Sequence, residues 1–529
     1  MRPLPRLTVL GAALSMLAAG APAATAQTRP SIEVEALTEL NAWSVGSIAP
    51  SSGGLPRTLW LDSDPDALQA LFDRAPGDFA SPAARSLARR ALASAAEAPL
   101  GDPAEASRKR FEALGRMGAV DDLLIMARPA AIASDPTIAQ FAAQAELARG
   151  DLGGACLRAQ AAGSAYLLRL RAFCAAVEGN IGALDLTLSL LRETGEARDP
   201  WFEQALAVIG GAPPARPPAA RFDTSLNTWL SLAGRLTPAR NALNGASTLA
   251  LVALASADRG DARLRAEAGL AALGRSAMEP ALTRTLYRAA LATGDARTAP
   301  PLGLAIAQAE ALPGGLEAAT AIASVLGAAR SQSEFIAISR IFRDDLSALS
   351  SAPDAATGVT LARGALAAGD SSTGLRLLDL AQAAGAEQSA LGSLRAAAWV
   401  GVRGLTEAQA ALVVRRRIDD GAGGGPAMRD VLILQALGFP VDASVRRAQL
   451  GQSPTGGRPA DGAVIAALQS AAEAQAVGEV ALLAAIAASG GADTLDGQSL
   501  WVIINALRLV GLEDAAQAIG MEALLIRPA

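Results

Sequence analysis

The stretch GALAAGDSSTGLRLLDLAQAAG, residues 364–385, has the pattern of two helices joined by a tight elbow. After the glycine, polar side chains recur at steps of three and four, and leucine and alanine fill the opposite side. This spacing is typical of an amphipathic helix, and the small apolar run 355–368 indicates another helix before it. Gly369 can end the first helix, and Asp370 can cap the second through its side-chain oxygens. The sequence therefore predicts an antiparallel helical hairpin.

The same kind of elbow recurs along the chain. Five intervals between neighbouring elbows are 33 to 35 residues long. A period of about 34 residues is typical of a helix–turn–helix repeat, which stacks into a solenoid. We therefore predict an all-α superhelix (α-solenoid) of antiparallel helical hairpins, and the alternative is an irregular alanine-rich bundle. The elbows are centred on Gly118, Gly150, Gly179, Gly260, Gly294, Gly327, Gly369, Gly404, Gly438, Gly478 and Gly511.

Some of these elbows share further features. Four are Gly-Asp pairs, and a small residue stands five positions after the glycine at Ala155, Ala299 and Ala516. On these features the chain resembles the tetratricopeptide-repeat family over about residues 105–526. The aromatic positions of the family's first helix are missing, as at Ala365. The resemblance implies an α-solenoid that binds partners on a concave face.

The first 26 residues have the composition of a secretory signal peptide. Two arginines precede the apolar run LTVLGAALSMLAAG, and Ala24-Thr25-Ala26 is a small-residue cleavage site. We expect cleavage between Ala26 and Gln27 and a periplasmic or secreted protein. The alternative, an uncleaved anchor, conflicts with the length of the apolar run, which is short of the ~20 residues that span a bilayer. We expect no transmembrane segment in the mature chain.

The charge balance of the mature chain argues against nucleic acid as a partner. Without the first 26 residues the chain has 44 basic and 51 acidic side chains, a net charge of −7. Binding to nucleic acid requires a concentrated basic surface. The two short basic runs, 108–110 and 415–417, lie beside acidic residues and are interpreted as solvated helix faces. Lysine occurs once against 45 arginines, which we attribute to the GC-rich codon usage of a bacterium.

Proline and glycine clusters suggest how the chain is divided. Residues 27–60 contain Pro, Ser and Gly clusters and are predicted to be an irregular N-terminal arm. The segment GAPPARPPAAR at 211–221 holds four prolines, so it cannot be the interior of a helix and is predicted to be a stiff linker. It would separate an N-terminal repeat region, 61–210, from a C-terminal repeat region, 222–529.

The sequence offers little for catalysis. There is no histidine, so triads that use histidine and the usual zinc sites are excluded. The single lysine, Lys109, lies outside any P-loop pattern. Adjacent acids occur at 121–122, 344–345 and 419–420, but neighbours in sequence point to different faces of a helix. We therefore predict a protein that is not an enzyme, with no catalytic, cofactor-binding or metal-binding residues.

The two cysteines are the strongest site prediction. Cys156 and Cys174 fall on two successive predicted helices with a turn near Gly163 between them. An antiparallel hairpin brings such helices side by side, and an oxidising compartment favours a disulfide. The alternative is two buried thiols that act as small apolar residues. The absence of a CxxC motif excludes the usual redox-active arrangement.

These patterns predict a non-catalytic helical scaffold or adaptor that binds another protein in the bacterial envelope. A glycan-binding or peptidoglycan-directed protein is the first alternative, and it would need exposed aromatic side chains along a groove. A self-associating structural component is the second. The tryptophans at 43 and 60 are expected to anchor the arm onto the first helices, and Trp501 is expected to lie in the core.

Overall fold

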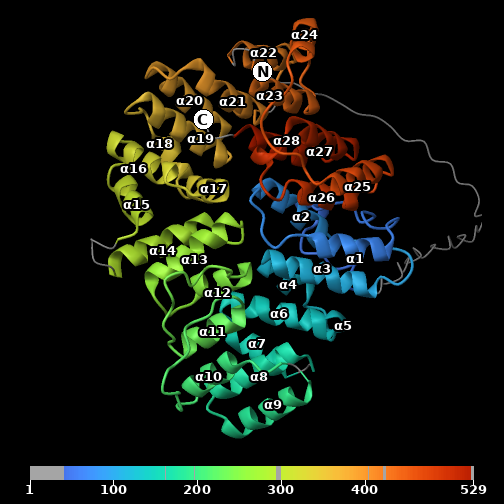
Figure 1. The fold of residues 1–529 in the computed structure, drawn as a ribbon, viewed down its shortest axis with the longest axis vertical. Coiled ribbons are helices and arrows are strands. Elements are labelled where there is room, and N and C mark those ends of the chain that lie inside the picture. The colour runs from blue at the N-terminus through green and yellow to red at the C-terminus, as the bar shows by residue number, and fades with distance from the viewer. Residues whose placement is uncertain are drawn as a thin grey trace, which may run out of the picture. The chain divides into compact units, whose positions relative to one another are not determined.

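The described part of the chain is all-α in a computed structural model, which confirms the predicted fold class (Figure 1). The structure describes residues 41–160, 163–195, 197–293, 299–402, 404–420 and 424–525. Across these ranges there are 28 α-helices, two 3-10 helices and no β-strand. Helices that follow one another in sequence pack against each other, as in a helical-repeat architecture. The predicted signal peptide and residues 27–40 lie outside the described ranges.

The first half of the helices covers α1 (Pro65–Arg74), α2 (Pro82–Ala93), α3 (Ala104–Met117), α4 (Val120–Met126), α5 (Ala130–Ala133), α6 (Pro136–Arg149), α7 (Leu152–Ala159), α8 (Ala165–Val177), α9 (Ile181–Glu193), α10 (Pro200–Ile209), α11 (Ser225–Ala233), α12 (Thr248–Ser256), α13 (Ala262–Gly274) and α14 (Pro280–Thr293). The second half covers α15 (Pro301–Ala311), α16 (Leu316–Gly327), α17 (Gln332–Ile341), α18 (Arg343–Ala348), α19 (Ala355–Ala367), α20 (Ser371–Ala383), α21 (Gln388–Val400), α22 (Glu407–Asp420), α23 (Gly425–Ala436), α24 (Ala443–Gly451), α25 (Gly462–Glu473), α26 (Val477–Ala487), α27 (Gly497–Leu509) and α28 (Glu513–Leu524). The 3-10 helices are η1 (Pro50–Ser52) and η2 (Ala492–Thr494).

The hairpin at 364–385 forms as the sequence predicts. Gly369 has φ of 80°, a left-handed conformation that glycine adopts without a steric penalty, and it separates α19 from α20. The carboxylate of Asp370 accepts a hydrogen bond from the backbone N–H of Thr373 at 2.9 Å and so caps α20. Asp151 and Asp261 cap α7 and α13 in the same way. The Gly-Asp elbows therefore work as helix stop and start signals.

Most of the predicted elbow glycines occupy this left-handed conformation. Two of the predicted elbows differ in the structure. Gly327 is the last residue of α16, and Gly478 lies in the first turn of α26. The prediction for Gly478 is wrong because its glycine is needed for packing: a Cβ there would lie 2.5 Å from the Trp60 ring. Gly294 lies outside the described residues. The elbows with positive φ are Gly118, Gly150, Gly179, Gly260, Gly369, Gly404, Gly438 and Gly511.

The segment before α1 is fastened to the helices, as expected from its tryptophans. Trp43 and Trp60 are buried, and both rings pack against Phe72 of α1. The indole N–H of Trp43 donates to the carbonyl of Pro103 at 3.2 Å. Trp501 is half-buried against the core. The aromatic rings therefore anchor the irregular segment on the helical region.

The beginning and the end of the helical region are in contact (Figure 1). Helices α1 and α2 pack against α26, and α2 also packs against α28. The carboxylate of Glu522 on α28 accepts hydrogen bonds from the Ser81 hydroxyl and from the Ala83 N–H, the latter at 2.8 Å. The Ala80 N–H donates to the carbonyl of Ser489 at 2.8 Å. We call this contact the closing junction, because it joins residues about 400 positions apart in sequence.

The proline-rich segment 211–221 contains no helix and lies between α10 and α11. It is held at its C-terminal end, because the Trp201 indole donates to the Ala219 carbonyl at 2.8 Å and the Ala220 N–H donates to Thr237 at 3.0 Å. Contacts place the described residues, from Asn41 onward, in one compact unit. The division into repeat regions at this segment stays a prediction.

The interpretation of the basic runs as solvated faces is wrong for one residue in each. Arg110 is fully buried and donates to the carbonyls of Leu92 and Ser94, both at 2.6 Å. Arg417 is buried against Asp430, with Nε 2.7 Å from the carboxylate. Burial lowers the pKa of Arg110 to about 9, still a charged side chain at neutral pH. Arg110 thus satisfies carbonyls at the end of α2, and Arg417 neutralises a buried carboxylate, and the charge pattern of the sequence reveals neither role.

Candidate functional site

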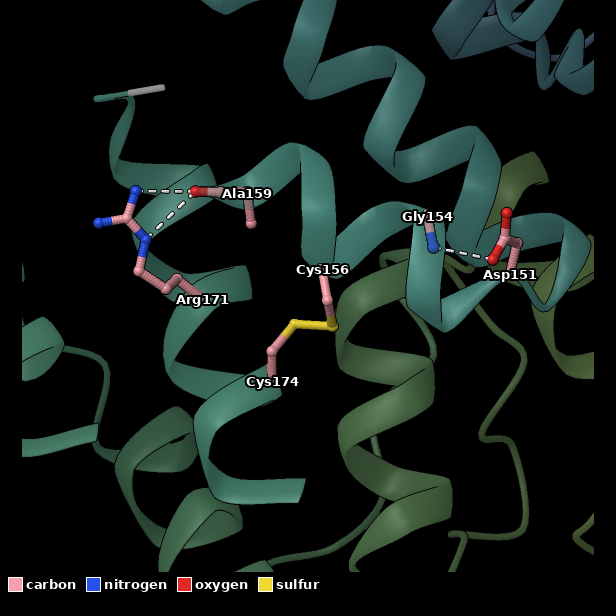
Figure 2. The surroundings of a disulfide bond; sticks show 6 residues. All are labelled: Asp151, Gly154, Cys156, Ala159, Arg171 and Cys174. Carbon is pink, nitrogen blue, oxygen red and sulfur yellow. Dashed lines mark hydrogen bonds between the residues drawn. A yellow bond between two sulfur atoms is a disulfide. The ribbon is translucent and has the colours of Figure 1, made fainter. Parts of the chain in front are cut away.

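Cys156 on α7 and Cys174 on α8 form a disulfide, as the hairpin geometry predicts (Figure 2). Their Cα atoms are 5.8 Å apart. Toward the connection between the two helices the Arg171 guanidinium donates to the carbonyl of Ala159, the last residue of α7, at 2.8 and 3.2 Å. The bond therefore crosslinks two neighbouring helices, and within the described residues there is no free cysteine beside it.

The adjacent acidic residues separate onto different faces, as predicted. Asp122 is buried and its two oxygens accept from Arg89 at 2.6 and 2.8 Å, while Asp121 is exposed and pairs with Arg149. Asp345 likewise pairs with Arg284, with Nη1 2.6 Å from the carboxylate. Each of these buried or half-buried carboxylates already neutralises a guanidinium. None is positioned as a free general acid or base.

The aromatic side chains contribute to the interior. The chain has 6 tryptophans, 2 tyrosines and 10 phenylalanines, and all of them fall within the described ranges. Every one is buried or half-buried. None of these rings is among the exposed side chains of the described surface.

One hollow of the described chain, of about 750 Å³, lies beside α13, α14 and α17. We call it the α13–α17 groove. One wall comes from the connection between α11 and α12, which contributes the exposed side chains of Arg240, Asn241 and Asn244. Leu270 and Ile338 contribute apolar surface to the same hollow. The groove thus combines apolar contacts with amide and guanidinium donors.

Two ion pairs stand in this groove near a buried tyrosine. Arg263 pairs with Glu267 at 2.9 Å on α13, and Arg330 pairs with Glu334 at 3.4 Å at the start of α17. Burial raises the pKa of the Tyr287 hydroxyl, and the nearby carboxylates of Glu267 and Glu334 raise it further. The tyrosine therefore stays protonated at neutral pH. The groove presents donors, acceptors and both signs of charge.

A second hollow, of about 450 Å³, lies between α2, α4, α12 and the turn before α14. We call it the arginine pocket, because Arg85, Arg89 and Arg149 line it. Its opposite side is formed by Ser256 and by the residues 276–279. Elements from both sides of the proline-rich segment thus build one cavity. Sequence reasoning could not find it, because its lining residues lie up to about 200 positions apart.

Arg85 differs from the other arginines of this pocket. Its side chain is 4% exposed, its Nη2 donates to the carbonyl of Met117, and its Nη1 has no hydrogen-bond partner. Arg89 and Arg149 are both paired with aspartates. Burial lowers the pKa of Arg85 to about 10, so the group remains a cation at neutral pH. The pocket therefore contains a buried guanidinium with an unsatisfied donor.

Two further kinds of site would be a metal-binding cluster and a membrane-spanning helix. Among the described residues no three His, Cys, Asp or Glu side chains gather in the way that a metal site requires. In that same part of the chain, no helix has both the length and the hydrophobicity needed to cross a membrane. No protein-family model, curated protein or solved structure matches this chain.

Proposed function

We propose that this chain is an exported, non-catalytic helical-repeat scaffold, similar to tetratricopeptide-repeat proteins, that binds another protein in the bacterial envelope. The observation that carries the proposal is the α13–α17 groove, whose volume of about 750 Å³ lies within the roughly 300–1,000 Å³ of specific ligand sites. The groove offers hydrogen-bond donors and acceptors beside apolar surface. An extended peptide segment needs this combination, because its backbone is polar and its side chains are mixed.

The charges of the groove favour a segment that carries both signs of charge. Arg263 and Glu267 stand one helical turn apart on α13, and Arg330 and Glu334 repeat the pairing across the groove. A segment that carries charges of one sign would meet one like charge in each of these two ion pairs. The glycan alternative receives less support, because the described chain displays no exposed aromatic side chain.

The proposal is tested by photo-cross-linking in cells. A photoreactive amino acid replaces Asn244, which is exposed in the groove, and a matched variant carries it at Ser189, exposed on α9. We expect one envelope protein, near one-to-one, to be captured from the groove position and not from α9. Capture of the same chain would favour the self-associating alternative, and equal capture from both positions would contradict the groove assignment.

A charge exchange then tests recognition without changing the net charge. The double variant Arg263→Glu/Glu267→Arg keeps the pair on α13 but reverses its direction in the groove. We expect at least a tenfold loss of affinity for the captured partner, measured by titration calorimetry. The matched control is Arg198→Glu/Glu203→Arg, an ion pair outside the groove, which we expect to bind as the parent does.

Export is tested separately by the mass of the protein recovered from the periplasm or medium. We expect a chain that begins at Gln27, because Ala24-Thr25-Ala26 has the small residues of a cleavage site. Recovery of the intact chain with the membrane fraction would contradict the signal-peptide prediction and favour an anchor.

A further inference from the structure

The arginine pocket contains a buried hydrogen-bond donor, Nη1 of Arg85, that has no partner. Arg85 is buried, and no described carboxylate lies within ion-pair distance of it. Asp122, the nearest buried acid on α4, already accepts from Arg89 at 2.6 and 2.8 Å and from the Ser47 hydroxyl at 2.6 Å. Asp78 pairs with Arg275 at 3.1 Å. The acids around Arg85 are thus taken by other partners, and its Nη1 is left unpaired.

An unpaired buried donor is unfavourable, because it has given up its hydrogen bonds to water without a replacement. A guanidinium is especially suited to anions, since its N–H groups form strong hydrogen bonds with carboxylate and phosphate oxygens. The Arg85 side chain also lines a hollow of about 450 Å³. The site has a cation, a free N–H group and space for a ligand.

The charges around the pocket limit the anion to a single negative charge. Asp121, Asp122 and Glu279 line the same hollow and balance its three arginines. A phosphate dianion would face these three carboxylates and would need donors for three oxygens. Nη2 of Arg85 is bound to the Met117 carbonyl, and Nη1 is the buried donor of this side chain that has no partner. One oxygen of a carboxylate matches the free Nη1, and Ser256 lines the hollow as a further hydroxyl donor.

We propose that the arginine pocket binds a carboxylate group through Arg85. The carboxylate can come from an acidic side chain of a bound protein or from a small carboxylic acid, and the two share the same recognition chemistry. This site is separate from the α13–α17 groove, with residues 276–279 lining the pocket and Arg275 lining the groove. A failure of the carboxylate site would therefore leave the groove proposal intact.

The test is a calorimetric titration of the purified protein at constant ionic strength with four probes. Propionate supplies the carboxylate, propionamide is its uncharged counterpart, inorganic phosphate is the dianion, and acetyl-Gly-Asp-Gly-amide presents an acid on a peptide. We expect propionate and the peptide to bind and propionamide not to bind. Tighter binding of the peptide would point to a protein source, and equal binding would point to a small acid. Absence of binding by both, or tighter binding of phosphate, would overturn the proposal.

Two variants separate binding from folding. Arg85→Gln removes the cation, and we expect the dissociation constant for propionate to rise at least tenfold. Because this variant also loses the contact to Met117, a second variant, Ala277→Leu, narrows the pocket from the opposite wall without touching that contact. We expect the same loss from it. The control Arg446→Gln, an exposed arginine on α24, should bind as the parent does, and parental affinity in Arg85→Gln would refute the site.

Discussion

The closing junction and the hairpins α7–α9 are held together in different ways. At the closing junction, helices from opposite ends of the chain share buried rings and hydrogen bonds, as between Trp60 and Gly478 or between Ser81 and Glu522. In the hairpins, each helix packs on its sequence neighbour, and the main neighbour of α9 is α8. There the covalent bond between Cys156 and Cys174 adds to the packing.

The closing junction and α9 also differ in how much of their large apolar side chains is exposed. On α9, Leu186 is 63% exposed, whereas the large side chains of the closing junction are buried. A junction between distant segments must exclude water and match shapes to offset the entropy of bringing them together. A hairpin closes a short loop and needs less burial, because its helices are already near each other. Substitutions should therefore have larger effects at the junction than on α9.

The largest expected effect is that of Trp60→Ala. The indole is fully buried between Phe72 and α26, so the variant loses apolar burial and leaves a cavity. We expect the free energy of unfolding to fall by about 3–5 kcal/mol, measured by chemical denaturation. The control is Trp399→Ala, a half-buried tryptophan on α21, which should cost less. Equal losses in the two variants would contradict the special role of the junction.

The next effect is that of removing the disulfide. Reduction, or the double variant Cys156→Ser/Cys174→Ser, frees a loop with a sequence separation of 18. The closed loop restricts the unfolded chain, so we expect a loss of about 3 kcal/mol. Hydrogen exchange should show faster opening in α7 and α8 and little change at the closing junction. Reductant should leave the double variant unchanged, and faster exchange first at α2 and α28 would contradict this view.

The pH dependence of the junction should come from Glu522. Burial raises its pKa to about 7, and the charge of Asp493 on η2 acts in the same direction, while the hydrogen bonds from Ser81 and Ala83 oppose it. The folded protein then holds a proton that the unfolded chain releases near pH 4.5, so stability falls as the pH rises from about 4.5 to 7.

We expect this loss to be on the order of 3 kcal/mol in the parent. The variant Glu522→Gln cannot titrate and should show a flatter profile over the same window. The measurement is the free energy of unfolding at pH 5, 6, 7 and 8 in both proteins. A parent that gains stability across this range relative to the variant would show that the carboxylate is ionised in the junction.

The smallest effect is expected on α9. Leu186→Ala removes an exposed side chain and should change the free energy of unfolding by less than about 0.5 kcal/mol. Leu184→Ala on the same helix is the matched comparison, because that side chain is 9% exposed and packs inward, and it should cost about 2 kcal/mol. Denaturation curves of the two variants decide the point. A larger loss from Leu186 would show that its face is covered in the protein in solution.

The elbows show which features of the fold can be predicted from the sequence and which cannot. Gly369 and Asp370 act locally, one ending a helix and one capping the next, so their roles can be read from neighbouring residues. Gly478 has the same sequence context, yet it is a glycine because Trp60 from the opposite end of the chain packs on it. Local patterns carry no information about such a distant neighbour.

The candidate sites divide in the same way. The pairing of Cys156 with Cys174 follows from one hairpin and its loop length, so it could be predicted. Asp121 and Asp122 stood out as a pair, and the separation of their faces was predicted, but their partners Arg149 and Arg89 were not. The arginine pocket is built from segments far apart in sequence, and no periodic pattern marks Arg85 as buried.

The sequence by itself determined the all-α class, the Gly-Asp elbows with their caps, and the disulfide, because each depends on residues within one or two helical turns or one loop. The tertiary structure alone decided that the first and last helices meet, that Arg110 and Arg417 are buried, and that Arg85 lacks a partner. Burial and charge pairing are properties of the surroundings in space. They depend on side chains that the folded chain brings together from distant positions.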